Sequence, residues 1–170
     1  MVEWLPVVKL NIRKLKMKLY LVRHGIYVPM DVSMTCPLSP EGRAEIYRLA
    51  SFFSKLRLKV PNIFHSSKLR AIQTAEILAN AVSDGRCEFL EGLEPNDPIP
   101  PMLKIINART EDLMLVGHLP YIAKLTDRIL AVDEDITLVD YQPGTTVCLS
   151  NDSGQWSINW ILNSTLCSQI

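Results

Sequence analysis

The chain has 170 residues, of which 48% are hydrophobic and 21% charged, a composition typical of one globular domain with a substantial core. Eighteen basic residues balance eighteen acidic ones, and the resulting formal net charge of zero argues against a general binder of nucleic acid or of membrane surfaces. Recognition of an anion would therefore depend on a few side chains that converge at one place.

Residues 1–16 precede the first clear strand pattern and are interpreted as an accessory extension without a catalytic role. In this segment the apolar residues 4–8 come before a basic stretch at 13–16, which is the reverse of the order in a secretory signal. No apolar run has transmembrane length, and the four cysteines lack the spacing of a metal site. We expect free thiols, a cytoplasmic protein, and a single domain over residues 17–170.

Apolar runs and helical periodicities alternate along the following hundred residues. The runs predict strands at residues 18–22, 60–65, 87–90 and 113–116. The periodic segments predict helices at residues 40–56, 68–82, 102–108 and 120–130. Proline-rich or aperiodic stretches predict loops at 26–38 and 91–101. The first helix begins with a serine cap, Ser39, and a proline at its first position.

The end of the chain changes from helical to strand periodicity. Residues 145–150 and 156–161 read as two strands joined by a turn at 151–154. Trp156 and Trp160 are interpreted as core aromatics on one face of the second strand. Strands that alternate with helices, followed by a hairpin, predict an α/β fold: a three-layer α/β/α sandwich around a mostly parallel mixed sheet.

Basic and imidazole side chains follow the carboxyl ends of three predicted strands. Arg23 and His24 come directly after the first strand, and His118 follows the fourth. The second strand ends at His65, and the helix after it carries Arg70 in its first turn. Ligands of open α/β sheets bind outside the carboxyl ends of the strands, where helix N-termini favour anions and arginine fits phosphate oxygens. The pattern therefore predicts a site for a phosphoryl group.

A histidine in such a site can do more than bind. A neutral imidazole is a nucleophile that splits phosphoryl transfer into two displacements, and charge stabilisation supports both steps. His24 is a candidate nucleophile, because it lies between the end of the strand and Gly25, which allows a tight turn, and can there attack from the floor of the site. His118 is a candidate hydrogen-bond donor or proton carrier. Physical arguments from the sequence do not assign these two roles.

Three segments resemble the motifs of the histidine phosphatase, or phosphoglycerate mutase-like, superfamily. They are Val-Arg-His-Gly at 22–25, Ser-Ser-Lys-Leu-Arg-Ala-Ile-Gln-Thr at 66–74, and Gly-His-Leu-Pro at 117–120. The resemblance covers about residues 17–162 and is greatest to the small phosphohistidine phosphatases of the SixA type. Mutase relatives usually carry a hydroxyl residue and an asparagine soon after the first motif, and this chain has neither there.

The resemblance implies roles for individual residues. His24 would be the nucleophile and would form a phosphohistidine intermediate, while Arg23, Arg70 and His118 would hold the phosphoryl oxygens. No metal or other cofactor is expected. The short stretch between the second and third motifs leaves no room for a large cap insertion, which suits a phosphorylated side chain on another protein, such as a histidine phosphotransfer domain. We expect the protein to be a monomer.

The general acid is the least defined part of this prediction. Larger relatives place a carboxylate after the third strand, where this chain has Glu91, Glu94 and Asp97, with Glu94 as the candidate acid and solvated loop acids as the other interpretation. An imidazole leaves readily without a strong acid, because its conjugate acid titrates near neutral pH. A phosphate ester would react roughly two to four orders of magnitude more slowly without one. The sequence therefore favours phosphohistidine as the substrate.

Two alternatives remain open. One is a phosphatase of small phosphate monoesters, which a carboxylate over the site would favour. The other is a catalytically weak module that binds phosphoproteins, which a His24 turned away from Arg70 and His118 would favour. Near the site, His65 is interpreted as a packing or rim residue and Ser66 as a cap of the following helix.

Overall fold

The computed structural model describes residues 17–131 and 136–168, and the predicted extension at 1–16 lies outside these ranges. The strands are β1 (Met17–Arg23), β2 (Asn62–His65), β3 (Glu88–Phe89), β4 (Leu113–Gly117), β5 (Thr146–Asp152) and β6 (Gln155–Leu162). The helices are α1 (Pro40–Lys55), α2 (Leu69–Val82), α3 (Ile99–Asn107), α4 (Tyr121–Ile129) and a 3-10 helix, η1 (Ser164–Ser168). In this part of the chain, no helix is long and apolar enough to cross a membrane.

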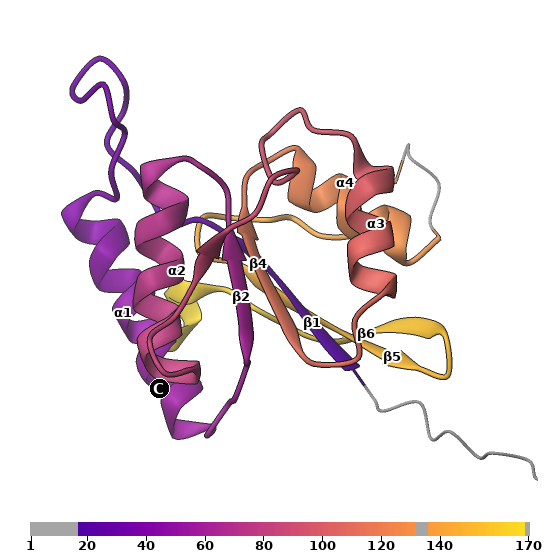
Figure 1. Cartoon of the computed structure of the whole chain (residues 1–170). Coiled ribbons are helices and arrows are strands. Elements are labelled where there is room, and N and C mark those ends of the chain that lie inside the picture. The colour runs from indigo at the N-terminus through magenta and orange to yellow at the C-terminus, as the bar shows by residue number, and fades with distance from the viewer. Residues whose placement is uncertain (1–16, 132–135, 169–170) are drawn as a thin grey trace, which may run out of the picture.

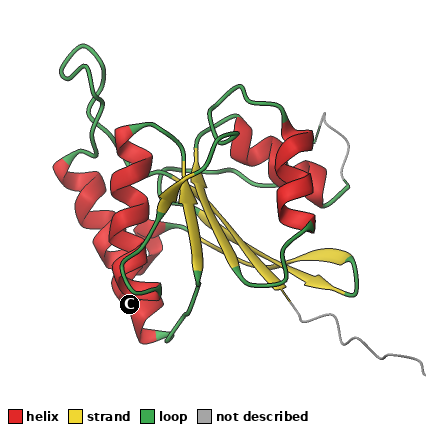
Figure 2. Cartoon of the chain, viewed as in Figure 1, coloured by secondary structure: helices red, strands yellow, loops and turns green. Residues whose placement is uncertain are grey.

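The strands form one sheet in the order β3-β2-β4-β1-β5-β6. Strands β1 to β4 are parallel, whereas β5 is antiparallel to β1 and β6 is antiparallel to β5. Figures 1 and 2 show α1 and α2 on one side of the sheet and α3 and α4 on the other. The predicted three-layer sandwich with a mostly parallel mixed sheet is confirmed.

The central strand β1 connects two apolar cores. Its side chains alternate between the faces of the sheet, as the two-residue period of a strand requires. Tyr20 and Val22 pack in the core beneath α1 and α2, and Leu19 and Leu21 pack in the core beneath α3 and α4. All four are fully buried, which explains why β1 reads as a continuous apolar run rather than as an alternating one.

The register of the parallel strands brings the polar motif residues to one edge. Arg23, the last residue of β1, pairs with Gly117, the last residue of β4. His65, at the end of β2, pairs with Val116. The residues that follow these strands therefore leave the sheet side by side, and the backbone N–H of His24 donates to the carbonyl oxygen of Gly117 at 3.1 Å.

Helix α3 begins three residues earlier than the sequence predicts. Its first turn contains Ile99, Pro100 and Pro101, which the sequence places in a loop. Proline is tolerated there, because N–H groups of the first turn have no partner within the helix and the fixed proline φ suits helical backbone. The prediction of an irregular loop over 91–101 is therefore wrong for its last three residues.

The two tryptophans of β6 lie on opposite faces of the sheet. The pairing of β5 with β6 is irregular at one place. Cys148 pairs with Trp160, but the next residue, Leu149, pairs with Ile158, so one residue of β6 has no partner. The extra residue of this β-bulge reverses the side-chain alternation. Trp160 packs against the core beneath α1 and α2, and Trp156 packs against the core beneath α3 and α4. The prediction that both share one face is wrong, because strand alternation in a sequence does not reveal a bulge.

Candidate active site

His24 lies directly after β1 and is buried, with 4% of its surface exposed. Its Nδ1 lies 2.8 Å from the carbonyl oxygen of Gly25. A carbonyl oxygen can only accept, so Nδ1 carries the proton and Nε2 carries the lone pair. Burial lowers the pKa of His24 to about 3, and the charges of Arg70 and Arg23 act in the same direction. His24 therefore presents a neutral imidazole with a nucleophilic Nε2.

The glycine after His24 is needed for space. A Cβ atom at Gly25 would lie 2.8 Å from Cγ1 of Ile46 on α1. The backbone N–H of Gly25 donates to Oγ1 of Thr74 at 3.2 Å, and that hydroxyl donates to the carbonyl oxygen of Arg70 at 2.7 Å. The first motif is thus tied to α2, whereas the sequence reading explained this glycine by a tight turn.

Arg70 lies in the first turn of α2 and contacts His24 directly. Its Nε donates to Nε2 of His24 at 3.1 Å. The guanidinium lies 4.5 Å from the centre of the Tyr27 ring, and that ring meets the His24 ring edge-on at 5.4 Å. A cation therefore stands beside the nucleophilic nitrogen, and an aromatic ring supports both side chains.

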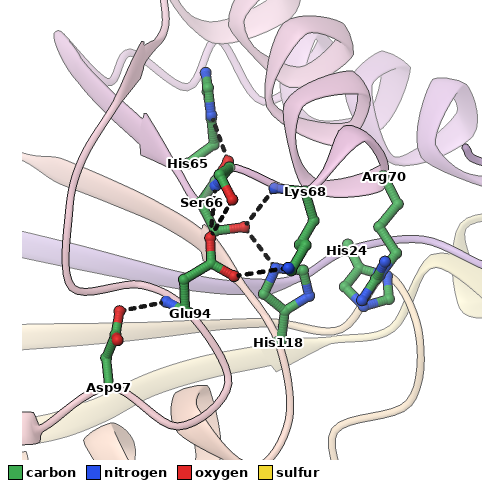
Figure 3. A network of polar contacts seen from close by, with 9 residues as sticks. His24, His65, Ser66, Lys68, Arg70, Glu94, Asp97 and His118 are labelled. Carbon is green, nitrogen blue, oxygen red and sulfur yellow. Dashed lines mark hydrogen bonds and ion pairs between the residues drawn. The ribbon is translucent and has the colours of Figure 1, made fainter. Parts of the chain in front are cut away.

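His118 follows β4 and lies beside His24, with 4.8 Å between the ring centres. Its Nε2 lies 2.5 Å from Oγ of Ser66, while its buried Nδ1 has no hydrogen-bond partner in the described part of the chain. Figure 3 shows these side chains in one network. Burial lowers the pKa of His118 to about 4, and the charge of Arg70 adds to this effect. A Ser66 hydroxyl that donates to Nε2 leaves the proton on Nδ1, which makes His118 a neutral donor.

Ser66 orients His118 and does not cap α2. The helix begins at Leu69, its capping position is Lys68, and no side chain caps it. The hydroxyl of Ser66 lies 3.4 Å from the backbone nitrogen of Lys68, a long contact, and 2.5 Å from His118. The predicted capping role is wrong because α2 starts at Leu69, so that Lys68 takes the capping position and the Ser66 hydroxyl contacts His118 instead.

Arg23 is the last residue of β1, and a backbone carbonyl fixes its guanidinium. Nη1 donates to the carbonyl oxygen of Tyr141 at 2.5 Å, and the buried Nε has no hydrogen-bond partner among the described residues. Burial lowers the pKa of Arg23, while the nearby Asp140 and Tyr27 oppose that shift. The charge of Arg23 also lowers the pKa values of His24 and His118, so the two histidines share a positive field.

Glu94 is the candidate acid that the structure brings to this cluster. Its Oε1 accepts hydrogen bonds from the backbone nitrogen of Ser67 at 2.9 Å and from the Ser67 hydroxyl at 2.6 Å. Its Oε2 lies 3.6 Å from Nζ of Lys68. Burial raises the pKa of Glu94, but the Ser67 hydrogen bonds and the Lys68 charge outweigh it, so the pKa is lowered. Glu94 is therefore held as a carboxylate.

The remaining sequence candidates have other roles or no contact with the cluster. The carboxylate of Asp97 accepts a hydrogen bond from the backbone nitrogen of Glu94 at 2.8 Å and so shapes the loop. Glu91 is exposed. His65 is buried and its Nδ1 donates to the carbonyl oxygen of Ser66 at 2.9 Å, and in Figure 3 it points away from His24. Among the described residues, no three His, Cys, Asp or Glu side chains are grouped so as to hold a metal ion.

The burial of neutral His24 predicts a loss of stability in acid. Because its pKa falls from 6.5 to about 3 on folding, the unfolded chain binds more protons between these values, and stability declines as the pH falls through that window. We expect His24 alone to reduce the free energy of unfolding by about 2–3 kcal/mol between pH 7 and pH 4.5. Urea unfolding at both values measures this, and His24→Asn should lessen the decline. An equal decline in wild type and variant would contradict the argument.

The chain is similar in sequence and in fold to known proteins. Residues 19–94 match the model of the histidine phosphatase superfamily (branch 1). An uncharacterized protein of Picosynechococcus sp. is 32% identical over 120 residues, which cover 66% of this chain and 73% of that protein. A structure of the protein histidine phosphatase SixA complexed with tungstate superposes with a TM-score of 0.77 at 20% identity, covering 88% of this chain and 99% of the other. A putative phosphohistidine phosphatase SixA from Agrobacterium tumefaciens has a TM-score of 0.68 at 20% identity, covering 85% and 96%.

Proposed function

The chain belongs to the histidine phosphatase superfamily, branch 1, and from this premise we propose that it removes the phosphoryl group from phosphohistidine on a signalling protein. The reaction passes through phospho-His24. Two similar solved structures are described as phosphohistidine phosphatases of the SixA type, and one of them is complexed with tungstate, a tetrahedral oxyanion like phosphate. A histidine phosphotransfer domain is the kind of substrate that suits this proposal.

The proposed reaction consists of two displacements at phosphorus. Nε2 of His24 attacks the phosphorus atom, and the bond between phosphorus and the substrate imidazole nitrogen breaks. The substrate leaves as a neutral imidazole when its other ring nitrogen is protonated. A water molecule then attacks phospho-His24, inorganic phosphate leaves, and Nε2 regains its lone pair.

The cations around Nε2 stabilise the transferring group. Arg70 lies within hydrogen-bond distance of the attacking nitrogen, and Arg23 extends from the end of β1. The Nδ1 of His118, which has no partner in the described chain, is a donor on the same side. Phosphoryl transfer depends mainly on position and charge stabilisation, so these donors supply most of the catalysis that the reaction needs.

The ionisation of Glu94 is the observation that favours phosphohistidine over a phosphate ester as the substrate. Its carboxylate is held ionised by Ser67 and Lys68, so it does not offer a proton to a leaving alkoxide. A protonated phosphoimidazole needs no such proton, whereas an ester does. A site with a nucleophile and several cations, but without a protonated acid, therefore suits phosphohistidine better than a monoester.

Glu94→Gln tests this choice. The amide oxygen still accepts from Ser67, so we expect kcat for a phosphohistidine protein to change less than about tenfold, below the 10²–10⁴ that a general acid contributes. Steady-state kinetics of the variant, compared with Glu91→Gln on the exposed part of the same loop, give the measurement. A loss of two orders of magnitude or more only in Glu94→Gln would make Glu94 the acid.

The phosphomonoesterase alternative has one observation in its favour, since Glu94 is close enough for its charge to influence His118. In such an enzyme, the leaving alkoxide of the ester would take its proton from Glu94 or His118. The binding-module alternative has less support, because His24 lies against both Arg70 and His118 and a binder has no need of a nucleophilic Nε2.

A further inference from the structure

Residues 27–38, between β1 and α1, form a finger that is held together by its own backbone. Tyr27 and Leu38 make an antiparallel bridge at its base, and the nitrogen of Val28 donates to the carbonyl oxygen of Pro37 at 2.8 Å. At the tip, two backbone nitrogens donate to the carbonyl oxygen of Pro29 at 3.0 and 3.1 Å. Figure 1 shows the finger projecting beyond the N-terminal ends of α1 and α2, at the edge of the sheet that carries the site.

The base of the finger is fixed to the catalytic cluster. The Tyr27 ring contacts His24 and lies under the guanidinium of Arg70. On the other side of the base, Leu38 is buried and its backbone nitrogen donates to Oε1 of Gln73 on α2 at 2.8 Å. The direction in which the finger projects is therefore set by the same helix that positions Arg70.

The tip of the finger presents apolar side chains to solvent. Met30, Val32 and Met34 are 66%, 73% and 85% exposed, and Asp31 is the one charged residue in the finger. Exposure of such large apolar side chains to water is unfavourable, and their burial against a partner would stabilise the complex. Methionine also adapts its shape to irregular surfaces.

The position of the finger selects the kind of partner. The Tyr27 ring at the base of the finger meets the His24 ring edge-on and lies under the Arg70 guanidinium, so the finger starts beside the nucleophile. Leu119, which directly follows His118, is a further partly exposed apolar side chain, with 37% of its surface accessible. A small phosphate ester has few atoms beyond its phosphoryl group, whereas a folded protein that presents a phosphorylated side chain has further surface with which to cover the exposed tip.

We propose that the finger is a docking element that binds an apolar patch beside the phosphorylated side chain of the protein substrate. The proposal rests on the proposed function and deepens it, because it assigns recognition of the protein part of the substrate to residues outside the catalytic cluster. Met30, Val32 and Met34 make the contact, and Tyr27 connects it to the site.

The test compares two substrates. A phosphohistidine-bearing phosphotransfer domain and para-nitrophenyl phosphate are offered to wild type, to the triple variant M30S/V32S/M34S and to the single variant Met34→Ser. We expect the triple variant to lose at least about tenfold in kcat/KM for the phosphoprotein, mainly through KM, with the single variant in between. Turnover of the aryl phosphate should stay within about twofold of wild type, since the catalytic cluster is unchanged.

The control is Leu56→Ser, which replaces a 58% exposed side chain just after the C-terminal end of α1. This variant should leave kcat/KM unchanged for both substrates. Equal losses on both substrates, or no loss on either, would overturn the docking role. An unchanged phosphoprotein reaction together with a dimer that the triple variant abolishes would also overturn it and assign the finger to contacts between copies. Wild type without phosphohistidine turnover would instead refute the proposed function.

Discussion

Replacing His24 with alanine is expected to lower kcat for a phosphohistidine protein by about four orders of magnitude or more. The structure places Nε2 of His24 beside Arg70 and keeps the ring neutral, with its Nδ1 proton held by Gly25. Removal of the nucleophile eliminates the covalent step, and the remaining cations cannot replace it. Rapid-quench kinetics with a radiolabelled phosphoryl donor should also show label on His24 in wild type and none on the variant.

The third histidine provides the control for this experiment. His65 is buried near the site, but its Nδ1 donates to the backbone carbonyl oxygen of Ser66 rather than to the catalytic side chains. We expect His65→Ala to retain activity within about tenfold of wild type. Substantial turnover by His24→Ala, or label that appears on His118 instead, would show that the nucleophile is another residue.

The second large effect is expected at Arg70. A lysine keeps the charge but loses the planar fork, so Arg70→Lys should reduce kcat about 100-fold, and Arg70→Ala about 1,000-fold. The reason is that Nε of Arg70 donates toward Nε2 of His24 while the guanidinium packs on the Tyr27 ring. Steady-state kinetics on the phosphohistidine protein measure both variants.

Arg109 offers a matched control for these variants. Its guanidinium lies 4.9 Å from the centre of the Phe64 ring, so it makes the same kind of contact as Arg70 without taking part in the cluster. Arg109→Lys should leave kcat within about twofold of wild type. If Arg70→Lys were as active as Arg109→Lys, the planar fork of the guanidinium would have no role in the reaction, and the assignment of Arg70 would be wrong.

The order of elements and the edge that carries the site could be predicted from the sequence. The apolar runs before Arg23 and before His118 mark buried parallel strands, and parallel strands end at the same edge of a sheet. The structure brings Arg23, His24, Arg70 and His118 together there, as the motifs indicate. Their catalytic roles remain predictions.

Other features depend on contacts that no local pattern encodes. The sequence could not tell which nitrogen of His24 carries the proton, because the answer lies in the orientation of the Gly25 carbonyl. The contact of Ser66 with His118 joins residues 52 positions apart, and the bulge in β6 changes a face without changing composition. Tyr27 lay in a segment read only as a loop, although an aromatic residue two positions after Gly25 was a signal that could have been tested.

The most direct test of the central claim is the substrate preference of the wild-type protein. The rates of dephosphorylation of a phosphohistidine phosphotransfer domain and of an alkyl phosphomonoester, phosphoserine, should be measured side by side, in the presence of a metal chelator. We predict that kcat/KM for the phosphohistidine protein is higher by about two orders of magnitude or more, because a leaving alkoxide needs a proton that the leaving imidazole does not, and Ser67 and Lys68 hold Glu94 as a carboxylate. A preference for the alkyl ester would contradict the account and identify a phosphomonoesterase.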